Sequence, residues 1–179
     1  TDQLIPARFM SVPRSEGYGP YLLYDLRRDE AGALRSDFPL NSTNGASVLI
    51  AGRNFGCGSS REAAVYALVD AGFRAVIAPS FGDIFAGNAV NNGLLPAQVS
   101  DEELASLMVT GTCNIQIDLD AKTLSANGQT LGFTLDQTRQ VKLINGWDDI
   151  DLTLTQDDHI TTHRARLSDE HPWLWPLAR

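Results

Sequence analysis

Three patterns of apolar and polar positions follow one another along the chain. Residues 8–44 are irregular, and Pro and Gly interrupt each apolar run. Residues 47–110 alternate short apolar runs with helical periodicity, which is typical of parallel strands joined by helices. Between residues 113 and 135, apolar and polar side chains alternate with period two, which predicts antiparallel strands joined by tight turns. The chain is therefore predicted to fold as an α/β domain.

A strand–helix–strand unit is predicted at the start of the second pattern. Ser47–Ala51 and Arg74–Ala78 are predicted to be buried parallel strands, and a helix over Ser60–Ala71 connects them and ends at Gly72. The further predictions are a helix at 83–90, a third strand within 91–97, a helix at 101–110 with Leu104, Leu107 and Met108 on its apolar face, a helix at 136–144 and a helical tail over 157–167.

The chain before residue 47 is predicted to be a short strand at Leu4 and Ile5 followed by a mobile loop, with a helical turn or two within 21–28. The arginines of this loop are Arg8, Arg14, Arg27, Arg28 and Arg35, five of the 14 basic residues. Each is expected to be a solvated surface charge, with a lid that closes over an anion as the alternative. Because neither a repeat nor a linker is visible, 1–179 is predicted to be one domain: 1–46 as strand and mobile loop, 47–155 as core, and 156–179 as C-terminal helix and tail.

Composition narrows the class of protein. A domain of 179 residues can bury about 70% of its unfolded surface. The net charge of −8 and the absence of a cluster of Lys and Arg disfavour nucleic acid as a partner. Apolar runs are too short to span a membrane, so the protein is predicted to be cytoplasmic.

The candidate chemistry lies in Ala51–Glu62, which reads AGRNFGCGSSRE. Glycines between a strand and a helix allow close backbone approach to a ligand, and the N–H groups at a helix N-terminus attract anions. Arg61 adds a fork that can bind a carboxylate through two parallel hydrogen bonds. The stretch does not match GxGxxG, the P-loop or GxSxG. Ser59 and Glu62 also match a capping box, so a plain strand-to-helix turn remains the alternative to an anion site.

Metal ligation by this chain is not predicted. Cys57 and Cys113 are far apart, and two thiolates are too few for an iron–sulfur cluster, so another chain would have to supply one. His159 and His163 are four residues apart, but no third ligand is nearby. The tail tryptophans, Trp173 and Trp175, are expected to pack on this chain, with contact to a partner as the alternative.

Five stretches together resemble the small-subunit family of 3-isopropylmalate dehydratase, in the aconitase superfamily: TDQLIPARF, NFGCGSSRE, FRAVIAPSFGDIF, NGLLPA and GWDDID. The resemblance covers nearly the whole chain in the family's order. It implies the aconitase swivel fold, a β/β/α domain with a central strand–Gly/Ser loop–helix. It also implies a partner, the large subunit, which would carry a [4Fe–4S] cluster on three cysteines.

The resemblance further implies a hydro-lyase that converts 2-isopropylmalate through isopropylmaleate into 3-isopropylmalate, in leucine biosynthesis. By motif, Ser59 would be the catalytic base, and Ser60 and Arg61 would bind the substrate carboxylate. Gly58, like the glycine two residues before it, would permit backbone approach, and Asn54 would orient the loop.

Substrate choice is predicted to depend on the segment after Pro6, which contains Arg8, Phe9, Met10, Val12 and Arg14. Its apolar members suit an isopropyl group, whereas an arginine at its centre would suit a further carboxylate, as in homoaconitase. The two flanking arginines, Arg8 and Arg14, could still reach such a carboxylate.

The chain departs from the family at three positions. Ala63 stands where histidine is usual, and Val65 and Tyr66 replace a usual Pro-Trp. Two alternatives therefore remain. The chain could be the small subunit of a dehydratase for another hydroxydiacid, of the citramalate or dimethylmalate type. It could also be a non-catalytic module that senses an anion, although such a module would need no serine base.

Overall fold

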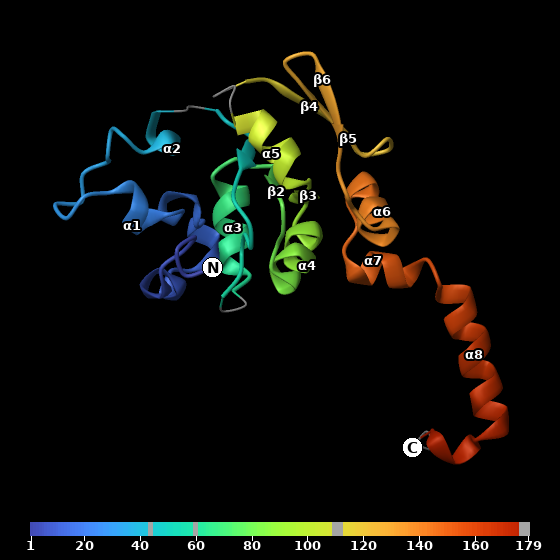
Figure 1. The fold of residues 1–179 in the computed structure, drawn as a ribbon. Helices are drawn as coiled ribbons and strands as arrows, with labels where there is room; N and C mark the ends of the chain where they lie inside the picture. The colour runs from blue at the N-terminus through green and yellow to red at the C-terminus, as the bar shows by residue number, and fades with distance from the viewer. Residues whose placement is uncertain (43–44, 59–60, 109–112, 176–179) are drawn as a thin grey trace.

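The computed structural model describes residues 1–42, 45–58, 61–108 and 113–175, and shows a mixed α/β domain with a helical C-terminal arm (Figure 1). A parallel sheet of three strands has the order β1–β2–β3. Its strands are β1 (Val48–Ile50), β2 (Ala75–Ala78) and β3 (Leu95–Gln98). The predicted parallel strands are confirmed.

A second sheet is antiparallel, with the order β4–β5–β6. Its strands are β4 (Ile115–Asp118), β5 (Thr123–Ala126) and β6 (Gln129–Gly132). Asn127 and Gly128 join the last two strands with φ of 50° and 79°, as a two-residue hairpin of type I′ requires. The predicted antiparallel strands and this turn are confirmed.

Short helices connect and cover the sheets. The α-helices are α1 (Tyr24–Arg27), α2 (Pro39–Ser42), α3 (Ala63–Asp70), α4 (Asp83–Asn91), α5 (Asp101–Met108), α6 (Gln137–Asn145), α7 (Asp149–Leu154) and α8 (Asp157–Glu170). The 3₁₀ turns are η1 (Ala7–Ser11), η2 (Arg14–Glu16), η3 (Gly19–Tyr21) and η4 (Pro172–Leu174). Of the α-helices, α2 and α7 are absent from the sequence predictions. None of the helices in the described ranges has the length and apolar character that a membrane span requires.

Opposite faces of β2 enter two separate apolar cores. Val76 belongs to the first core, together with side chains of α3, α4 and the N-terminal segment. Ala75 and Ile77 belong to the second core, together with side chains of α5 and the antiparallel sheet. All four residues of β2 are buried, as expected for a parallel strand covered on both faces.

The predicted N-terminal strand is wrong. Leu4 and Ile5 lie in a turn, in which the Ile5 N–H donates to the carbonyl of Thr1 at 3.0 Å. Both side chains are nevertheless buried in the first core. The Leu4 carbonyl accepts from the N–H of Leu23 at 2.8 Å, so the pair is anchored by a distant loop rather than by a neighbouring strand.

The apolar face predicted for α5 is confirmed only in part. Leu104 and Leu107 are buried in the second core, but Met108 is 62% exposed. Met108 is the last helical residue, and it lies about 100° around the axis from Leu107, so it leaves the buried stripe.

One carboxylate fixes the irregular segment to α3. Asp70, at the end of that helix, accepts two hydrogen bonds from Arg14, at 2.8 and 3.0 Å, and one from the backbone N–H of Tyr18 at 2.7 Å. Gly19 lies so close that a Cβ there would be 2.9 Å from the Asp70 carbonyl. The segment predicted to be a loop therefore contains three 3₁₀ turns, of which η3 packs against α3.

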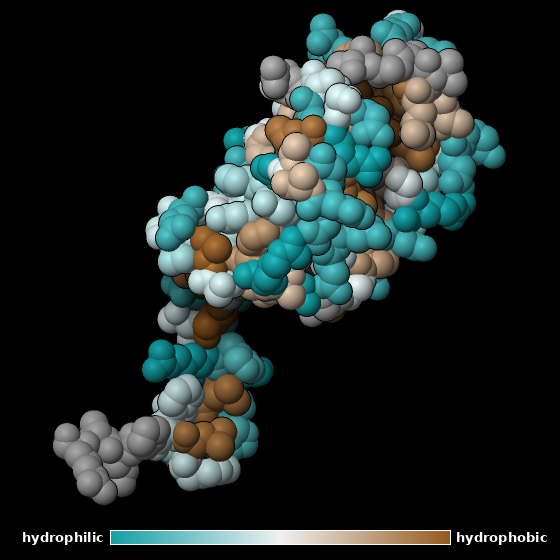
Figure 2. All heavy atoms as spheres, turned by 90° about the vertical axis from the view of Figure 1, so that its left-hand side faces the viewer, coloured by the Kyte–Doolittle hydropathy of each residue, from teal (hydrophilic) through white to brown (hydrophobic). Residues whose placement is uncertain are grey.

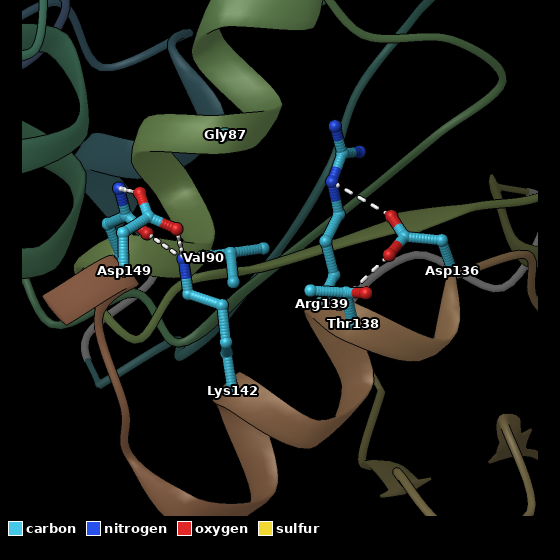
Figure 3. A pocket seen from close by; sticks show the side chains of 8 residues that line it. Gly87, Val90, Asp136, Thr138, Arg139, Lys142 and Asp149 are labelled. Atoms are coloured by element: carbon cyan, nitrogen blue, oxygen red, sulfur yellow. Dashed lines mark hydrogen bonds and ion pairs between the residues drawn. The ribbon is translucent and has the colours of Figure 1, made fainter. Parts of the chain in front are cut away.

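A buried ammonium fixes α6 and α7 to α4 (Figure 3). The Lys142 side chain is 6% exposed, and its Nζ donates to Asp149 Oδ1 at 2.5 Å and to Asn91 Oδ1. Asn91 Nδ2 in turn donates to Asp149 Oδ2 at 3.0 Å. The hydrogen bonds from Lys142 and then from Asn91 hold the pKa of the Asp149 carboxyl below its usual value.

The chain ends in an arm that leaves the body of the domain (Figures 1 and 2). It consists of α7, α8 and η4, residues 149–175, and is called the C-terminal arm below. The prediction that the tail tryptophans pack on the chain is wrong for Trp173, which is 74% exposed. Trp175 is half-buried and lies under the guanidinium of Arg164, whose Cζ is 5.1 Å from the ring centroid.

We expect Asp149→Ala to lower the free energy of unfolding by about 1–3 kcal/mol, because it leaves a buried ammonium with only a neutral acceptor. Lys142→Met, which removes the charge and keeps an apolar chain, should cost less. Because the folded pKa of Asp149 lies below the unfolded value, its contribution is complete above about pH 5 and is lost as the pH falls through the folded pKa. Urea unfolding as a function of pH measures both effects. A larger loss for Lys142→Met would contradict this account.

Candidate active site

The loop between β1 and α3, residues 51–62, is called the site loop below. It is fixed beside the loop that follows β2, because Phe55 forms a parallel bridge with Phe81. The Phe55 N–H donates to the Ser80 carbonyl at 3.0 Å, and the Gly82 N–H donates to the Phe55 carbonyl at 2.9 Å. The two loops therefore extend the pairing of β1 and β2 past the carboxyl end of the sheet, which is where ligands bind in open α/β sheets.

Asn54 enters this pairing in a left-handed conformation, with φ of 58°. Its N–H donates to Ser80 Oγ at 2.8 Å, and the Ser80 hydroxyl donates to Asn54 Oδ1 at 3.2 Å. Asparagine tolerates this backbone region better than most residues. These contacts fit the predicted role of Asn54 in orienting the loop, and Ser80 is a contributor that sequence reasoning missed.

Gly56 is required by the close approach of an aromatic ring. Its φ is +74°, and a Cβ there would lie 2.1 Å from Cγ of Phe85. The rings of Phe55, Phe81 and Phe85 contact one another, with centroids 5.3–6.3 Å apart. The middle of the site loop thus packs against the rings of Phe81 and Phe85, at the start of α4. Gly58, with φ of +116°, again uses a conformation that favours glycine.

Arg61 lies at the end of the site loop, with its side chain 22% exposed. Its Nη1 is buried and lies 2.6 Å from Asp2 Oδ1, as an ionic contact rather than an aligned hydrogen bond. Asp2 was not singled out from the sequence, although it stands in the quoted motif TDQLIPARF. The predicted base Ser59 and the predicted carboxylate ligand Ser60 lie outside the described residues.

The predicted helix start is wrong at this point. The structure begins α3 at Ala63, so Arg61 precedes the helix instead of lying in its first turn. Glu62 is the N-cap residue, and its carboxylate accepts from Asn92 Nδ2 at 3.0 Å. Glu62 therefore does not occupy the third helical position that the predicted capping box requires.

Both flanking arginines of the predicted specificity segment are paired with carboxylates. Arg8 donates to both Asp25 oxygens, one at 3.1 Å, and this interaction lowers the pKa of the Asp25 carboxyl. Arg14 binds Asp70 as described above, and its Cζ also lies 4.4 Å from the ring centroid of Tyr66.

The apolar members of this segment differ in exposure. Phe9 stacks on Tyr21 with centroids 4.4 Å apart, and Val12 packs against the first core. Met10 is 45% exposed. Within the segment, Met10 is thus the apolar side chain with the most surface to offer to a ligand.

The three departures from the family pattern lie in or against the first core. Ala63 and Val65 are 8% and 0% exposed, respectively. Tyr66 packs against the same core, and burial, followed by the nearby Glu62, raises the pKa of its hydroxyl. The substituted side chains therefore pack beneath the helix, so their identity affects packing more directly than contact with a ligand.

The cysteines and histidines occupy separate places. Cys57 is exposed in the site loop, whereas Cys113 packs against the second core. His163 Nδ1 lies 3.3 Å from Arg166 Nη2 on α8. In the part of the chain that the structure describes, no group of three or more His, Cys, Asp or Glu is placed to hold a metal ion.

A cavity of about 210 Å³ lies between α4, α6 and α7 (Figure 3). Charged side chains of both signs line it, including Lys142 and Arg139. It contains none of the predicted site residues, and its charges pair with each other through Asp149 and Asp136. The predicted site residues that the structure describes therefore lie outside this cavity.

We expect Gly56→Ala to lower the free energy of unfolding by about 2–5 kcal/mol, because a Cβ would overlap Phe85 at a positive φ. Gly52→Ala is the matched control in the same loop, since a Cβ there meets nothing within 4 Å. Thermal and urea unfolding of the two variants measure the difference. Equal effects would show that the ring contact does not constrain the loop.

Comparisons with known proteins identify the family that this chain resembles. Residues 25–102 match the family model for the aconitase C-terminal domain. The 3-isopropylmalate dehydratase small subunit of Rhodospirillum centenum is 43% identical, over 97% of this chain and 89% of that protein. The small subunit of Caulobacter vibrioides is 46% identical over the same shares. A crystal structure of 3-isopropylmalate dehydratase from Methanocaldococcus jannaschii superposes with a TM-score of 0.65, at 27% identity, over 91% of this chain and 90% of that one.

The fold expected from the resemblance is confirmed by the two sheets, the central strand–loop–helix and the match to the solved structure. The relatives span nearly the whole chain and share well over a third of its residues. The chain belongs to the family of 3-isopropylmalate dehydratase small subunits.

Proposed function

We propose that this chain is the small subunit of a cytoplasmic, heteromeric hydro-lyase that converts 2-isopropylmalate through isopropylmaleate into 3-isopropylmalate in leucine biosynthesis. Two relatives that match over almost the full chain bear the name of this enzyme's small subunit. The name of those relatives implies a large subunit as partner, and the proposed ligand is a small hydroxydicarboxylate.

The observation that carries the proposal is the position of Arg61. Its guanidinium is largely shielded from water and lies against Asp2 at the end of a loop that Phe55 and Gly56 fix to the neighbouring loop. A shielded guanidinium binds a carboxylate more strongly than an exposed one, because less water competes for the charge. Asp2 would hold the guanidinium of Arg61 in place while Arg61 and Ser60 bind the substrate carboxylate.

Ser59 is the proposed base, acting as an alkoxide that takes the proton from the carbon beside a carboxylate. Serine is a poor base in water, so its alkoxide must be stabilised by nearby positive charge and by exclusion of water. Arg61, two residues later, supplies positive charge to this part of the loop. Gly58 would let the backbone approach the substrate closely.

The large subunit is proposed to carry a [4Fe–4S] cluster, because this chain has only two cysteines and a cluster usually takes three or four. When bound, such a cluster supplies a Lewis acid for the leaving hydroxyl group. This chain would contribute the carboxylate-binding arginine and the base, and would exclude water where it closes over the partner.

The isopropyl group is proposed to contact the specificity segment. Arg8 and Arg14 are already paired with Asp25 and Asp70, which leaves the apolar side chains of the segment to meet the substrate. Met10 has the largest exposed surface among them. An apolar contact there favours isopropylmalate over substrates with a further carboxylate.

Ser59→Ala should lower turnover of isopropylmalate by about 10²–10⁴-fold, the usual contribution of a general base, while ligand binding is retained. The measurement is anaerobic reconstitution with the large subunit, with formation of isopropylmaleate followed and with citramalate and citrate as alternative substrates. Ser36→Ala, at an exposed position, is the matched control. Unchanged turnover in the Ser59 variant would remove its assigned role, and preferred turnover of citramalate would change the substrate.

Met10→Arg should lower turnover of isopropylmalate relative to analogues with a further carboxylate, because it places a cation where an apolar contact is proposed. The change should reach at least about tenfold in the ratio of kcat/KM values, which corresponds to about 1.4 kcal/mol. Ser11→Arg adds the same charge at the next, exposed position and serves as the control. Equal ratios for the wild type and the Met10 variant would exclude this segment as the determinant.

A further inference from the structure

The C-terminal arm is held to the domain at its root and is open beyond it. At the root, Asp149 binds Lys142 and Asn91. Farther along, α8 packs against η4, and each residue of α8 except Leu167 is exposed. Figure 1 shows this helix running away from the two sheets, and Figure 2 shows that a narrow part of the molecule projects from its body.

A helix in this position needs a surface to cover it. Isolated helices shorter than about 12–15 residues are marginal in water, and α8 has 14 residues. The arm exposes several large apolar side chains, at 46–74% of their surface. They are Ile150, Leu154, Ile160, Trp173 and Leu174. Single exposed apolar residues are ordinary, but a series of them on a projecting arm marks an interaction surface.

The apolar residues share faces of their helices. Ile150 and Leu154 are four residues apart on α7, and Ile160 and Leu167 are seven apart on α8, so each pair lies on one side. Thr162 lies on the opposite side of α8 from Ile160. Each of the two helices therefore presents apolar side chains on one of its sides, and Thr162 marks the polar side of α8.

The direction of the arm indicates which partner this is. In Figure 1 the arm projects past the same end of the domain at which the connection from β1 to α3, the site loop, lies. A protein seated over the site loop therefore borders the space into which the arm extends. A second copy of this chain is disfavoured, because two chains with a net charge of −8 each repel one another.

We propose that the C-terminal arm is a docking element for the large subunit, and that the exposed apolar side chains of α7, α8 and η4 pack on that subunit while the site loop faces the shared active site. This inference rests on the proposed function, because it takes the large subunit as the protein that covers the site loop. The arm contributes to affinity and not to chemistry, since none of its residues belongs to the candidate site.

The test compares the wild type with Ile160→Asp/Trp173→Ala and with the control Thr162→Asp, which places the same charge on the polar side of α8. Binding to the large subunit is measured by calorimetry without substrate, and circular dichroism checks that each variant is folded. The double variant should raise the Kd at least about tenfold, and the control should leave it within about twofold. At saturating concentrations of the double variant, kcat should equal that of the wild type.

An unchanged Kd for the double variant would overturn the proposal, and so would an equal loss in both variants. Analytical ultracentrifugation of the small subunit alone measures whether the arm binds a second copy of this chain instead. A wild-type dimer that the double variant dissociates would assign the arm to self-association and overturn the proposal. Because binding is measured without substrate, absence of isopropylmalate turnover in the wild-type complex would contradict the proposed substrate without changing the binding result.

Discussion

The backbone pairing between Phe55 and residues 80–82 is the constraint on which the rest of the site depends. It satisfies the N–H and carbonyl of Phe55 outside the regular strands, and so fixes the path of the site loop after β1. The ring of Phe85 then lies against Gly56 at a distance that no side chain would allow. Since Arg61 and α3 follow this loop along the chain, the same pairing fixes the point from which the chain leads to them.

Most of the fold could be predicted because its signals are local. The continuous apolar run at β2, the period-two alternation of β4 to β6 and the cap and left-handed glycine around α6 each depend on adjacent residues. The predictions were wrong where a local sequence pattern is compatible with more than one structure. Leu4 and Ile5 need burial, which a turn supplies as well as a strand does. The Ser–x–x–Glu pattern before α3 suits a cap, but Glu62 binds Asn92 instead, 30 residues away.

Only part of the geometry of the candidate site could be predicted. The glycines could be recognised because a close backbone approach and a positive φ demand that residue type, whereas substrate binding by Arg61 stays a prediction. The partners that hold them could not, because Asp2 and Ser80 come from distant parts of the sequence. Arg14 and Asp70 are likewise far apart in the sequence. Their pairing binds the Arg14 guanidinium to α3, whereas the sequence alone left this charge available to any anion.

The two ends of α3 contact different parts of the chain, and this affects how substrate specificity could change. Its N-terminal end adjoins Arg61, while Asp70 at its C-terminal end holds the irregular segment in place. The residues from Phe9 to Val12 lie between two fixed points, the Leu4–Leu23 hydrogen bond and the Asp70 contacts. On the proposed function, they form a unit that can be exchanged by itself: a lineage could alter this short stretch to accept a new substrate, while the loop to which we assign the chemistry and the cores beneath it remain as they are.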